Sequence, residues 1–138
     1  MTGHVDPERE QFEQFKLLPR DVPIMMLNLI RLKARAAYAD GRDATGAQAY
    51  TAYGEASGPI FQRLGGTIIW RGTPEVMLIG PPDERWDIAF IARYPNAGAF
   101  MAMVTDDAYR EAVKHRQAAV EDSRLVRLAE VPAGDGFG

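Results

Sequence analysis

The chain has 138 residues, of which 46% are hydrophobic and 25% are charged, and these fractions are typical of one soluble globular domain. Its formal net charge of -3 argues against nucleic acid or an anionic membrane surface as a partner. Cysteine is absent, which excludes disulfides, thiolate metal sites and cysteine nucleophiles and fits a reducing cytoplasm, and no apolar run is long enough to span a membrane.

Residues 1–21 predict a helical arm in front of the main domain, which we place at residues 22–130. Asp6 and Pro7 are typical of an N-cap followed by proline at the first helical position. The apolar residues that follow recur at helical spacing until Pro19 ends the run: Phe12, Phe15 and Leu18. We expect this helix to pack over the domain or over a partner.

The segment from Val22 to Leu32 predicts a buried strand. Alternation places Ile24, Met26, Asn28 and Ile30 on one face and Met25, Leu27, Leu29 and Arg31 on the other. Asn28 is the polar exception on its face, and a buried amide needs a hydrogen-bond partner. Either Asn28 serves the backbone, which is favoured, or it contacts a ligand in an apolar pocket.

Residues 33–45 predict a loop, either a plain solvated connection or a mobile lid over a site, and the next helix starts near Gly46 with Thr45 as its cap. Its expected inward stripe contains Tyr50, Tyr53, Ser57, Ile60, Phe61 and Leu64. Pro59 predicts a kink or break, and Gly65-Gly66 ends the helix. The two tyrosines are expected in the core with wet hydroxyls, and Tyr53 is kept as a candidate ligand contact.

Two further strands are predicted, at 67–71 and 86–94, with an edge strand or extended loop at 74–80 between them. In the first of these strands, Ile68 and Trp70 are expected on one face. In the second, Arg93 shares a face with Ala89 and Ile91, so its side chain either reaches outward to solvent or meets a carboxylate.

The last part of the domain predicts two helical segments and a closing strand. Pro95-Asn96 begins the first segment, and Thr105 or Asp106 caps the second, which points Tyr109, Val113 and Val120 inward. Its last turns carry Lys114, His115 and Arg116, as the helix dipole favours. Residues 123–129 form the closing strand, and residues 131–138 are expected to be a flexible tail.

The main elements follow the order βαββαβ, which is the ferredoxin-like plan and predicts an α+β fold. That topology places strands 22–32 and 86–94 in the middle of the sheet, and they are the two most apolar strands. Its helices cover one sheet face only. The other face would expose apolar side chains, which predicts a homodimer formed sheet to sheet.

Several stretches together resemble the family known as domain of unknown function 1330: MLNLIRLK, YADGRDATGAQAYTAYGE, LGGTIIWRG and the long segment from Trp86 to Val126. The resemblance runs from about Pro23 to Leu128. It implies a homodimeric α+β barrel with the two sheets face to face. It implies no particular activity, because the wider group of such barrels includes cofactor-free monooxygenases, lactone isomerases and haem enzymes.

The side-chain chemistry argues for a site without a metal or cofactor. There are two histidines: His4 is expected in a floppy terminus, and a haem ligated by His115 is disfavoured. No serine lies in a nucleophile-elbow context and no glycine loop matches a phosphate-binding pattern. Arg116 and Asp122 are expected in a structural network, with Arg116 meeting a carboxylate and Asp122 accepting backbone donors.

Three hypotheses remain open, so whether the protein is an enzyme is undecided. The favoured one is a cofactor-independent enzyme acting on a small apolar or aromatic acid in a barrel pocket. The alternatives are a non-catalytic binding or sensing protein that uses the same pocket, and a purely structural dimer. In the favoured hypothesis His115 moves a proton. The substrate contacts are then drawn from Asn28, Tyr53, Trp70, Arg93 and Arg116.

Overall fold

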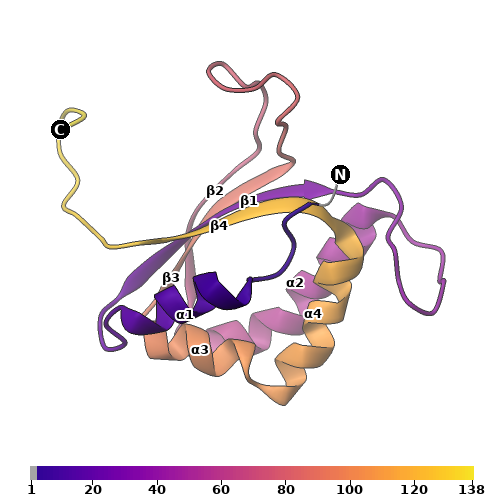
Figure 1. The fold of residues 1–138 in the computed structure, drawn as a ribbon, viewed down its shortest axis with the longest axis horizontal. Helices are drawn as coiled ribbons and strands as arrows, with labels where there is room; N and C mark the ends of the chain where they lie inside the picture. Colours follow the sequence, from indigo (N-terminus) through magenta and orange to yellow (C-terminus); the bar gives the residue numbers. More distant parts are fainter. Residues whose placement is uncertain (1–2) are drawn as a thin grey trace.

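The computed structural model describes residues 3–138 and contains a four-stranded antiparallel sheet covered by helices on one face (Figure 1). The elements in chain order are α1 (Arg9–Leu17), β1 (Ile24–Leu32), α2 (Gly46–Arg63), β2 (Thr67–Gly72), β3 (Ile88–Tyr94), α3 (Ala97–Val104), α4 (Asp107–Ala119) and β4 (Val120–Leu128). The strand order is β2-β3-β1-β4. The predicted α+β, ferredoxin-like plan is therefore confirmed, with β1 and β3 in the middle of the sheet.

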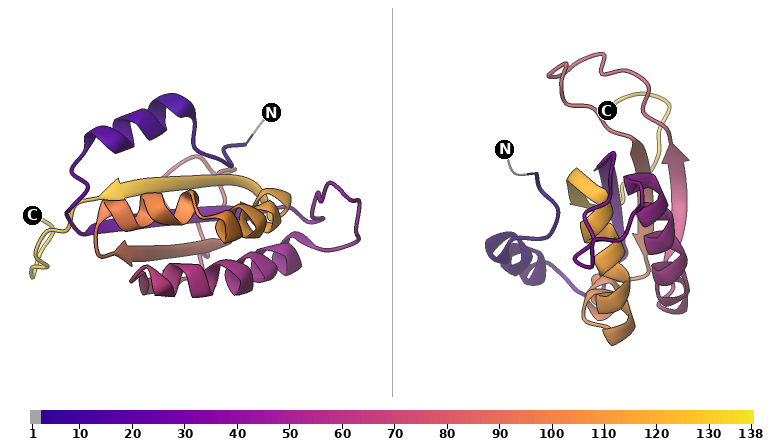
Figure 2. Two further views of the ribbon diagram at one scale, coloured as in Figure 1. Left: turned by 90° about the horizontal axis from the view of Figure 1, so that it is seen from below. Right: turned by 90° about the vertical axis from the view of Figure 1, so that its right-hand side faces the viewer.

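The helices divide into a layer and a separate arm. Helices α2, α3 and α4 lie against one face of the sheet, while α1 lies beside β4 (Figure 2). It contacts α3 through the rings of Phe15 and Phe100, whose centroids are 5.1 Å apart. The predicted alternation of β1 is confirmed, because Ile24, Met26 and Ile30 are buried under the helix layer. Leu27 and Leu29 lie on the opposite face, which we call the open face because no element of residues 3–138 covers it.

The arm begins differently from the prediction. Helix α1 starts at Arg9 after Glu8, whose side chain makes no cap hydrogen bond, so the predicted Asp6 cap is wrong. The physical reason is that residues 3–7 run along β4 and α4 instead, where the Asp6 carboxylate accepts from Gln117 at 3.3 Å. The expectation of a floppy terminus at His4 is also wrong, because its backbone N–H donates to Asp122 at 2.9 Å.

Helix α2 begins and ends where the sequence predicts. The Thr45 hydroxyl accepts from the Gln48 backbone while the Gln48 side chain accepts from the Thr45 backbone, which completes a capping box. Gly65 ends the helix with a φ of 85°, a left-handed conformation that favours glycine. The expected break at Pro59 is absent, since the helix runs unbroken to Arg63. Pro59 is exposed, and the helix is held through its contacts with α4.

Strand β2 contains an irregularity that the sequence analysis missed. Ile68 pairs with Ala92 and Trp70 pairs with Ile91, so Ile69 is an extra residue with no opposite partner. Ile68 therefore faces the helices and Trp70 lies on the open face, and the prediction that both share a face is wrong. Beyond β2, residues 74–80 form an extended loop rather than a strand, and Val76, Leu78 and Ile79 on it are exposed.

The loop at 33–45 is tied to the rest of the chain by backbone hydrogen bonds. Ala36 donates to Ala44, Ala37 donates to Ala118 and Lys33 donates to Ala119, all at 2.8 to 2.9 Å. These contacts hold the loop against the end of α4. None of its residues lines the cleft described below, so the position of the loop favours the connection over a lid.

Candidate functional site

A large cleft of about 1730 Å³ lies between the sheet and the helices. Ligand sites for drug-sized molecules typically measure ~300–1,000 Å³, so this cleft is large enough to hold a small ligand together with water. Its roof is the helix-facing side of the sheet, and its walls come from α1, α2, α3 and α4. We call it the cleft throughout.

The roof of the cleft contains a transverse row of side chains, one from each strand. The pairing registers align Arg71 with Phe90, Phe90 with Asn28 and Asn28 with Leu125. Directly opposite residues in antiparallel strands point to the same face, so all four side chains face the helix layer. Asn28 therefore lies at the centre of the roof, and Arg71 lies at its β2 edge.

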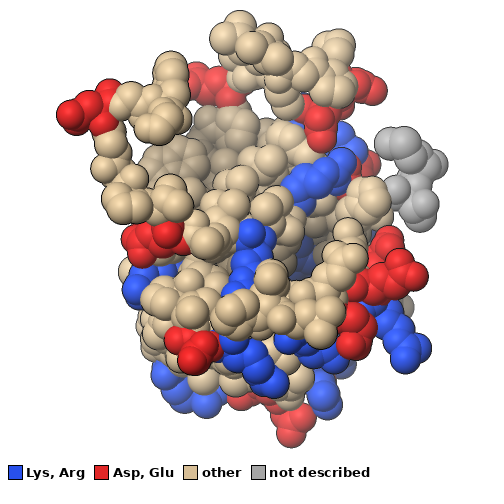
Figure 3. All heavy atoms as spheres, turned by 60° about the vertical axis from the view of Figure 1, so that its left-hand side comes forward, with Lys and Arg blue, Asp and Glu red and all other residues tan. Residues whose placement is uncertain are grey.

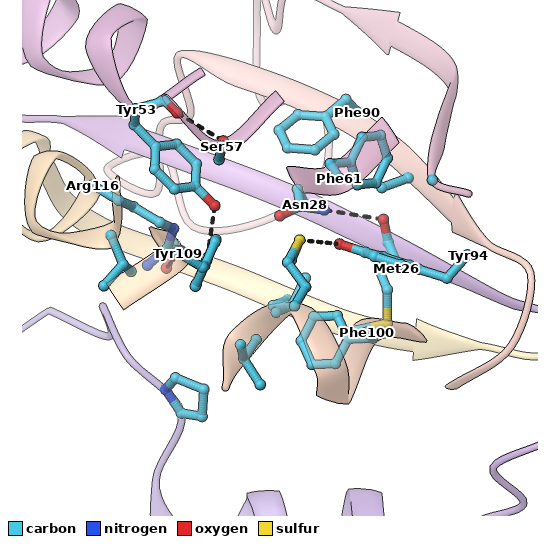
Figure 4. A pocket seen from close by; sticks show the side chains of 18 of the residues that line it. Met26, Asn28, Tyr53, Ser57, Phe61, Phe90, Tyr94, Phe100, Tyr109 and Arg116 are labelled. Carbon is cyan, nitrogen blue, oxygen red and sulfur yellow. Dashed lines mark hydrogen bonds between the residues drawn. The ribbon is translucent and has the colours of Figure 1, made fainter. Parts of the chain in front are cut away.

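Aromatic rings form much of the cleft wall (Figure 4). Tyr94 makes edge-to-face contacts with Phe61 on one side and Phe100 on the other, each with ring centroids 5.3 Å apart. Such pairs hold ring orientations in place beyond the effect of burial alone. The cleft therefore offers flat, rigid walls to a planar apolar ligand.

Two tyrosine hydroxyls meet inside the cleft. Tyr53 from α2 points toward Tyr109 from α4, and their hydroxyl oxygens are 2.8 Å apart (Figure 4). One hydroxyl proton forms this bond, so the pair keeps one further proton to donate to a ligand. Burial raises the pKa of Tyr109 well above its ordinary value, so the Tyr109 hydroxyl keeps its proton at neutral pH.

Asn28 presents an unused acceptor to the same space. Its side-chain N–H donates to the backbone carbonyl of Met26 at 3.0 Å. Within residues 3–138, no donor reaches the Asn28 side-chain oxygen, and Figure 4 shows this side chain among the cleft-lining residues. Both interpretations of Asn28, a backbone contact and a ligand contact, are therefore supported. Its nitrogen binds the backbone, while its oxygen faces the cleft.

Arg116 lies at the β4 side of the cleft. Its guanidinium donates to the backbone carbonyl of Val5 and to the Ser123 hydroxyl, the latter at 3.3 Å. The prediction that Arg116 meets a carboxylate is wrong. The nearby carboxylate of Asp122 pairs across the sheet with Arg31, on the open face, whereas Ser123 faces the cleft.

The Asp122 part of that prediction is confirmed. Its carboxylate accepts the backbone N–H groups of His4 and Ser123, each at 2.9 Å, and also pairs with Arg124 at 2.8 Å. Burial alone would raise the pKa of Asp122, but these hydrogen bonds and the Arg124 charge outweigh it and lower the pKa below its usual value. Asp122 therefore stays ionised at neutral pH.

Three of the predicted site residues lie away from the cleft. Arg93 pairs with Met25 and Trp70 pairs with Ile91, which places both on the open face. The His115 imidazole is bonded through Nδ1 to the Tyr38 hydroxyl at 2.6 Å and does not line the cleft. The structure therefore brings Asn28, Tyr53 and Arg116 into one cleft but does not bring Arg93 or His115 to Asn28.

Tyr109 and Phe90 line the cleft, although no sequence pattern predicted them as site residues. Helical spacing pointed Tyr109 inward, but it gave no reason to separate a core tyrosine from one that reaches a ligand space. Phe90 could have been found from the pairing of strands, since it lies directly opposite Asn28. Within residues 3–138, no group of three or more His, Asp or Glu side chains is placed to hold a metal ion.

Comparison with known proteins places the chain among uncharacterised relatives. The family described as domain of unknown function (DUF1330) matches residues 37–129. A protein of unknown function from Rhodopseudomonas palustris, RPA0582, is 60% identical, with a TM-score of 0.92 over 96% of this chain and 100% of that one. The methylated form of RPA0582 gives 61% identity and a TM-score of 0.94 over 98% of this chain and 100% of that one.

A more distant likeness concerns the fold alone. SnoaB from Streptomyces nogalater, a cofactor-independent oxygenase, is 11% identical, with a TM-score of 0.54 over 83% of this chain and 99% of that one. No match is found among curated proteins. No helix formed by residues 3–138 is long and apolar enough to cross a membrane.

Proposed function

This chain belongs to the DUF1330 family, and because that family carries no assigned activity, we propose from the chain's own residues that it is a cofactor-independent enzyme acting on a small aromatic acid. The observation that carries the proposal is the lining of the cleft. Aromatic walls surround a paired tyrosine hydroxyl, a free amide oxygen and a guanidinium. Apolar walls with a few convergent polar groups are typical of small-molecule sites.

Each polar group suits one part of such a ligand. The Arg116 guanidinium attracts a carboxylate, and its planar fork favours a bidentate contact. The free proton of the Tyr53–Tyr109 pair suits a carbonyl oxygen. The Asn28 oxygen accepts from a ligand hydroxyl, such as the one that a carbonyl becomes on enolisation.

The chemistry that this arrangement favours is enolisation of a carbonyl. As the tyrosine pair donates a hydrogen bond to the carbonyl oxygen, water takes the proton from the neighbouring carbon, the C–H electron pair forms the C=C bond and the carbonyl π pair moves to the oxygen. The protonated water then returns a proton to that oxygen, which gives the enol hydroxyl. Donors aimed at a developing oxyanion can contribute ~2.7–4 kcal/mol to such a step. His115 has no part in this proposal, because it is engaged with Tyr38 outside the cleft.

The non-catalytic alternative uses the same cleft without turnover and is separated from the enzyme only by measuring reaction. The structural-dimer alternative predicts a closed interior, and the volume of the cleft counts against it. SnoaB, which shares this fold, is a cofactor-independent oxygenase, so the fold is compatible with an enzyme that uses no cofactor. At that identity a shared fold does not choose the reaction.

Phenylpyruvate tests the proposal, because it combines an aromatic ring, a carboxylate and an enolisable ketone. We expect calorimetry to detect binding and NMR in D₂O to detect faster exchange of the benzylic protons in the presence of protein. Asn28→Leu should slow exchange by roughly tenfold, the effect of one lost hydrogen bond, and the double variant Tyr53→Phe/Tyr109→Phe, which removes both hydroxyl donors, should slow it by at least as much.

Glu55→Gln, on the exposed side of α2, is the matched control and should exchange the benzylic protons at the wild-type rate. Binding without accelerated exchange would leave only the non-catalytic alternative. No binding at millimolar phenylpyruvate would contradict both the enzyme proposal and the non-catalytic alternative.

We also infer that two copies associate through their open faces. The face carries Leu27, Leu29 and Ile91 at its centre, with Trp70 and Val126 about half exposed toward its edges. Between the loop after β2 and the C-terminal segment the surface is hollowed and mostly uncharged (Figure 3). Stable dimers bury ~1,200–2,000 Å² in total, and a four-stranded sheet face with this apolar centre is of that order. The charged side chains that share the face, Arg31, Arg93 and Asp122, lie toward the ends of their strands. Such a dimer would work in the cytoplasm, which the lack of cysteine favours.

A further inference from the structure

Residues 3–7, which we call the strap, close the β4 side of the cleft. Val5, Asp6 and Pro7 line the cleft directly. The strap is held to β4 by the His4 N–H, which donates to Asp122 at 2.9 Å, and by the Ser123 hydroxyl, which donates to the His4 carbonyl at 2.7 Å. The side chain of Gln117 on α4 adds a contact to Asp6 at 3.3 Å.

The strap also binds Arg116, one of the arginines that line the cleft. Arg116 donates to the Val5 carbonyl and to the Ser123 hydroxyl, and both acceptors are neutral. Within residues 3–138, no carboxylate lies in ion-pair contact with Arg116. Both bonds are already assisted by the guanidinium charge, but a carboxylate adds the attraction of an opposite charge and can accept two parallel N–H groups. A carboxylate that reached Arg116 would therefore displace the Val5 carbonyl.

We propose that the strap is a displaceable wall whose Val5 carbonyl stands where a ligand carboxylate oxygen binds to Arg116. Ser123, which no sequence pattern singled out, supplies the second contact of this carboxylate subsite through its hydroxyl. This inference rests on the proposed function, because it takes the ligand of the cleft to be an acid. An acid opens the strap when it binds, whereas a neutral ligand leaves it in place.

This competition has a measurable consequence for affinity. When only a fraction of the molecules has the strap open, the apparent affinity for an acid falls in proportion to that fraction. Weakening the strap without changing Arg116 should therefore tighten the binding of acids. The same change should leave the binding of a neutral analogue as it is.

Gly3 provides the means to weaken the strap. A Cβ at Gly3 would lie 1.8 Å from the backbone oxygen of Glu121, so any side chain there forces the strap away from β4. A Cβ at Gly134 meets nothing within 4 Å, which makes it the matched control. The experiment compares Gly3→Val, Gly134→Val and wild type for calorimetric binding of phenylpyruvate and of its uncharged analogue phenylacetone.

We expect Gly3→Val to bind phenylpyruvate about tenfold more tightly than wild type, as for release of one hydrogen bond, with phenylacetone unchanged. Gly134→Val should match the wild type for both. In the wild type, amide exchange of His4 should accelerate when phenylpyruvate is added and stay constant with phenylacetone, a readout that needs no variant.

Equal phenylpyruvate affinity in Gly3→Val and wild type, with a His4 amide that ignores the ligand, would overturn the displaceable strap and leave the proposed function standing. Tighter binding of both ligands by Gly3→Val would show that the strap blocks access to the cleft rather than competing for Arg116. Absence of phenylpyruvate binding in every variant would overturn the proposed function and this inference together.

Discussion

Two buried tyrosines make the stability of the fold decrease at alkaline pH. Tyr94 and Tyr109 are 5% and 8% exposed, and burial raises the pKa of each above the ordinary value of about 10. The folded state therefore holds these protons more tightly than the unfolded state. Their stabilising effect is complete below about pH 10 and is lost as the pH rises toward the folded-state pKa values.

We predict that the free energy of unfolding falls above about pH 10 by as much as ~1.4 kcal/mol per pH unit for each of these tyrosines. Tyr109→Phe should remove one such contribution, so its stability should decline less steeply than that of the wild type. Urea unfolding at pH 8, 10 and 11 measures the slopes. Parallel slopes for variant and wild type would contradict this role of the buried hydroxyl.

At the residue scale, the sequence predicted contacts that depend on local chemistry and missed those that depend on pairing. Asn28 stands out because its neighbours in β1 are apolar, and that signal is visible in a single segment. Arg93 could not be excluded in the same way, since its face is set by the strand opposite. Arg116 was assigned a carboxylate because the strap, which brings Val5 to it, is a contact between residues 111 positions apart.

At the scale of elements, α2 depends on its capping box. Thr45 satisfies one backbone N–H of the first turn, and Gln48 returns a contact to the Thr45 N–H. Loss of an N-cap side chain costs about 1 kcal/mol. We therefore predict that Thr45→Ala lowers the free energy of unfolding by about that amount, measured by urea denaturation.

Glu55→Ala, at an exposed position in the same helix, is the control and should change stability by less than ~0.5 kcal/mol. If the two variants were equally stable, the cap would contribute nothing measurable.

Helix boundaries were the more predictable part of the fold, for a physical reason. Caps and glycine ends act within four or five residues, so Thr45 and Gly65 could be recognised from the sequence alone. The start of α1 was not predictable from such signals, because Asp6 is drawn to Gln117 on α4. The distance between α2 and the sheet, which sets the size of the cleft, likewise depends on packing over the whole molecule.

At the scale of the whole molecule, the open face decides the oligomeric state. Leu27 lies half-buried in the centre of this face, whereas Met26, its neighbour in β1, is 3% exposed beneath the helices. We predict that the wild type sediments as a dimer at micromolar concentration and that Leu27→Asp sediments as a folded monomer, because a charge at the interface centre cannot be desolvated without a partner.

Ala56→Asp places the same charge on the exposed side of α2 and should remain dimeric. A wild-type monomer at micromolar concentration would rule out association through the open face. Met26→Asp is unsuited to this test, since a charge in the core would unfold the chain.

The topology itself was predictable because it follows from the most general signals. The two most continuously apolar strands, β1 and β3, occupy the centre of the sheet, where neighbours on both sides complete their hydrogen bonding. The order of helices and strands then leaves few arrangements. The side chains that share the cleft follow from register, which no single segment reveals.

The extra residue in β2 has a consequence for how such chains can change length in evolution. Ile69 is opposed by no residue of β3. Ile68 before it and Trp70 after it lie on opposite faces, as two directly consecutive residues of a regular strand do. Loss of this one codon would therefore leave Ile68 toward the helices and Trp70 on the other side. Deletion of Ile69 is thus expected among homologous chains, because it leaves the lining of the cleft unchanged.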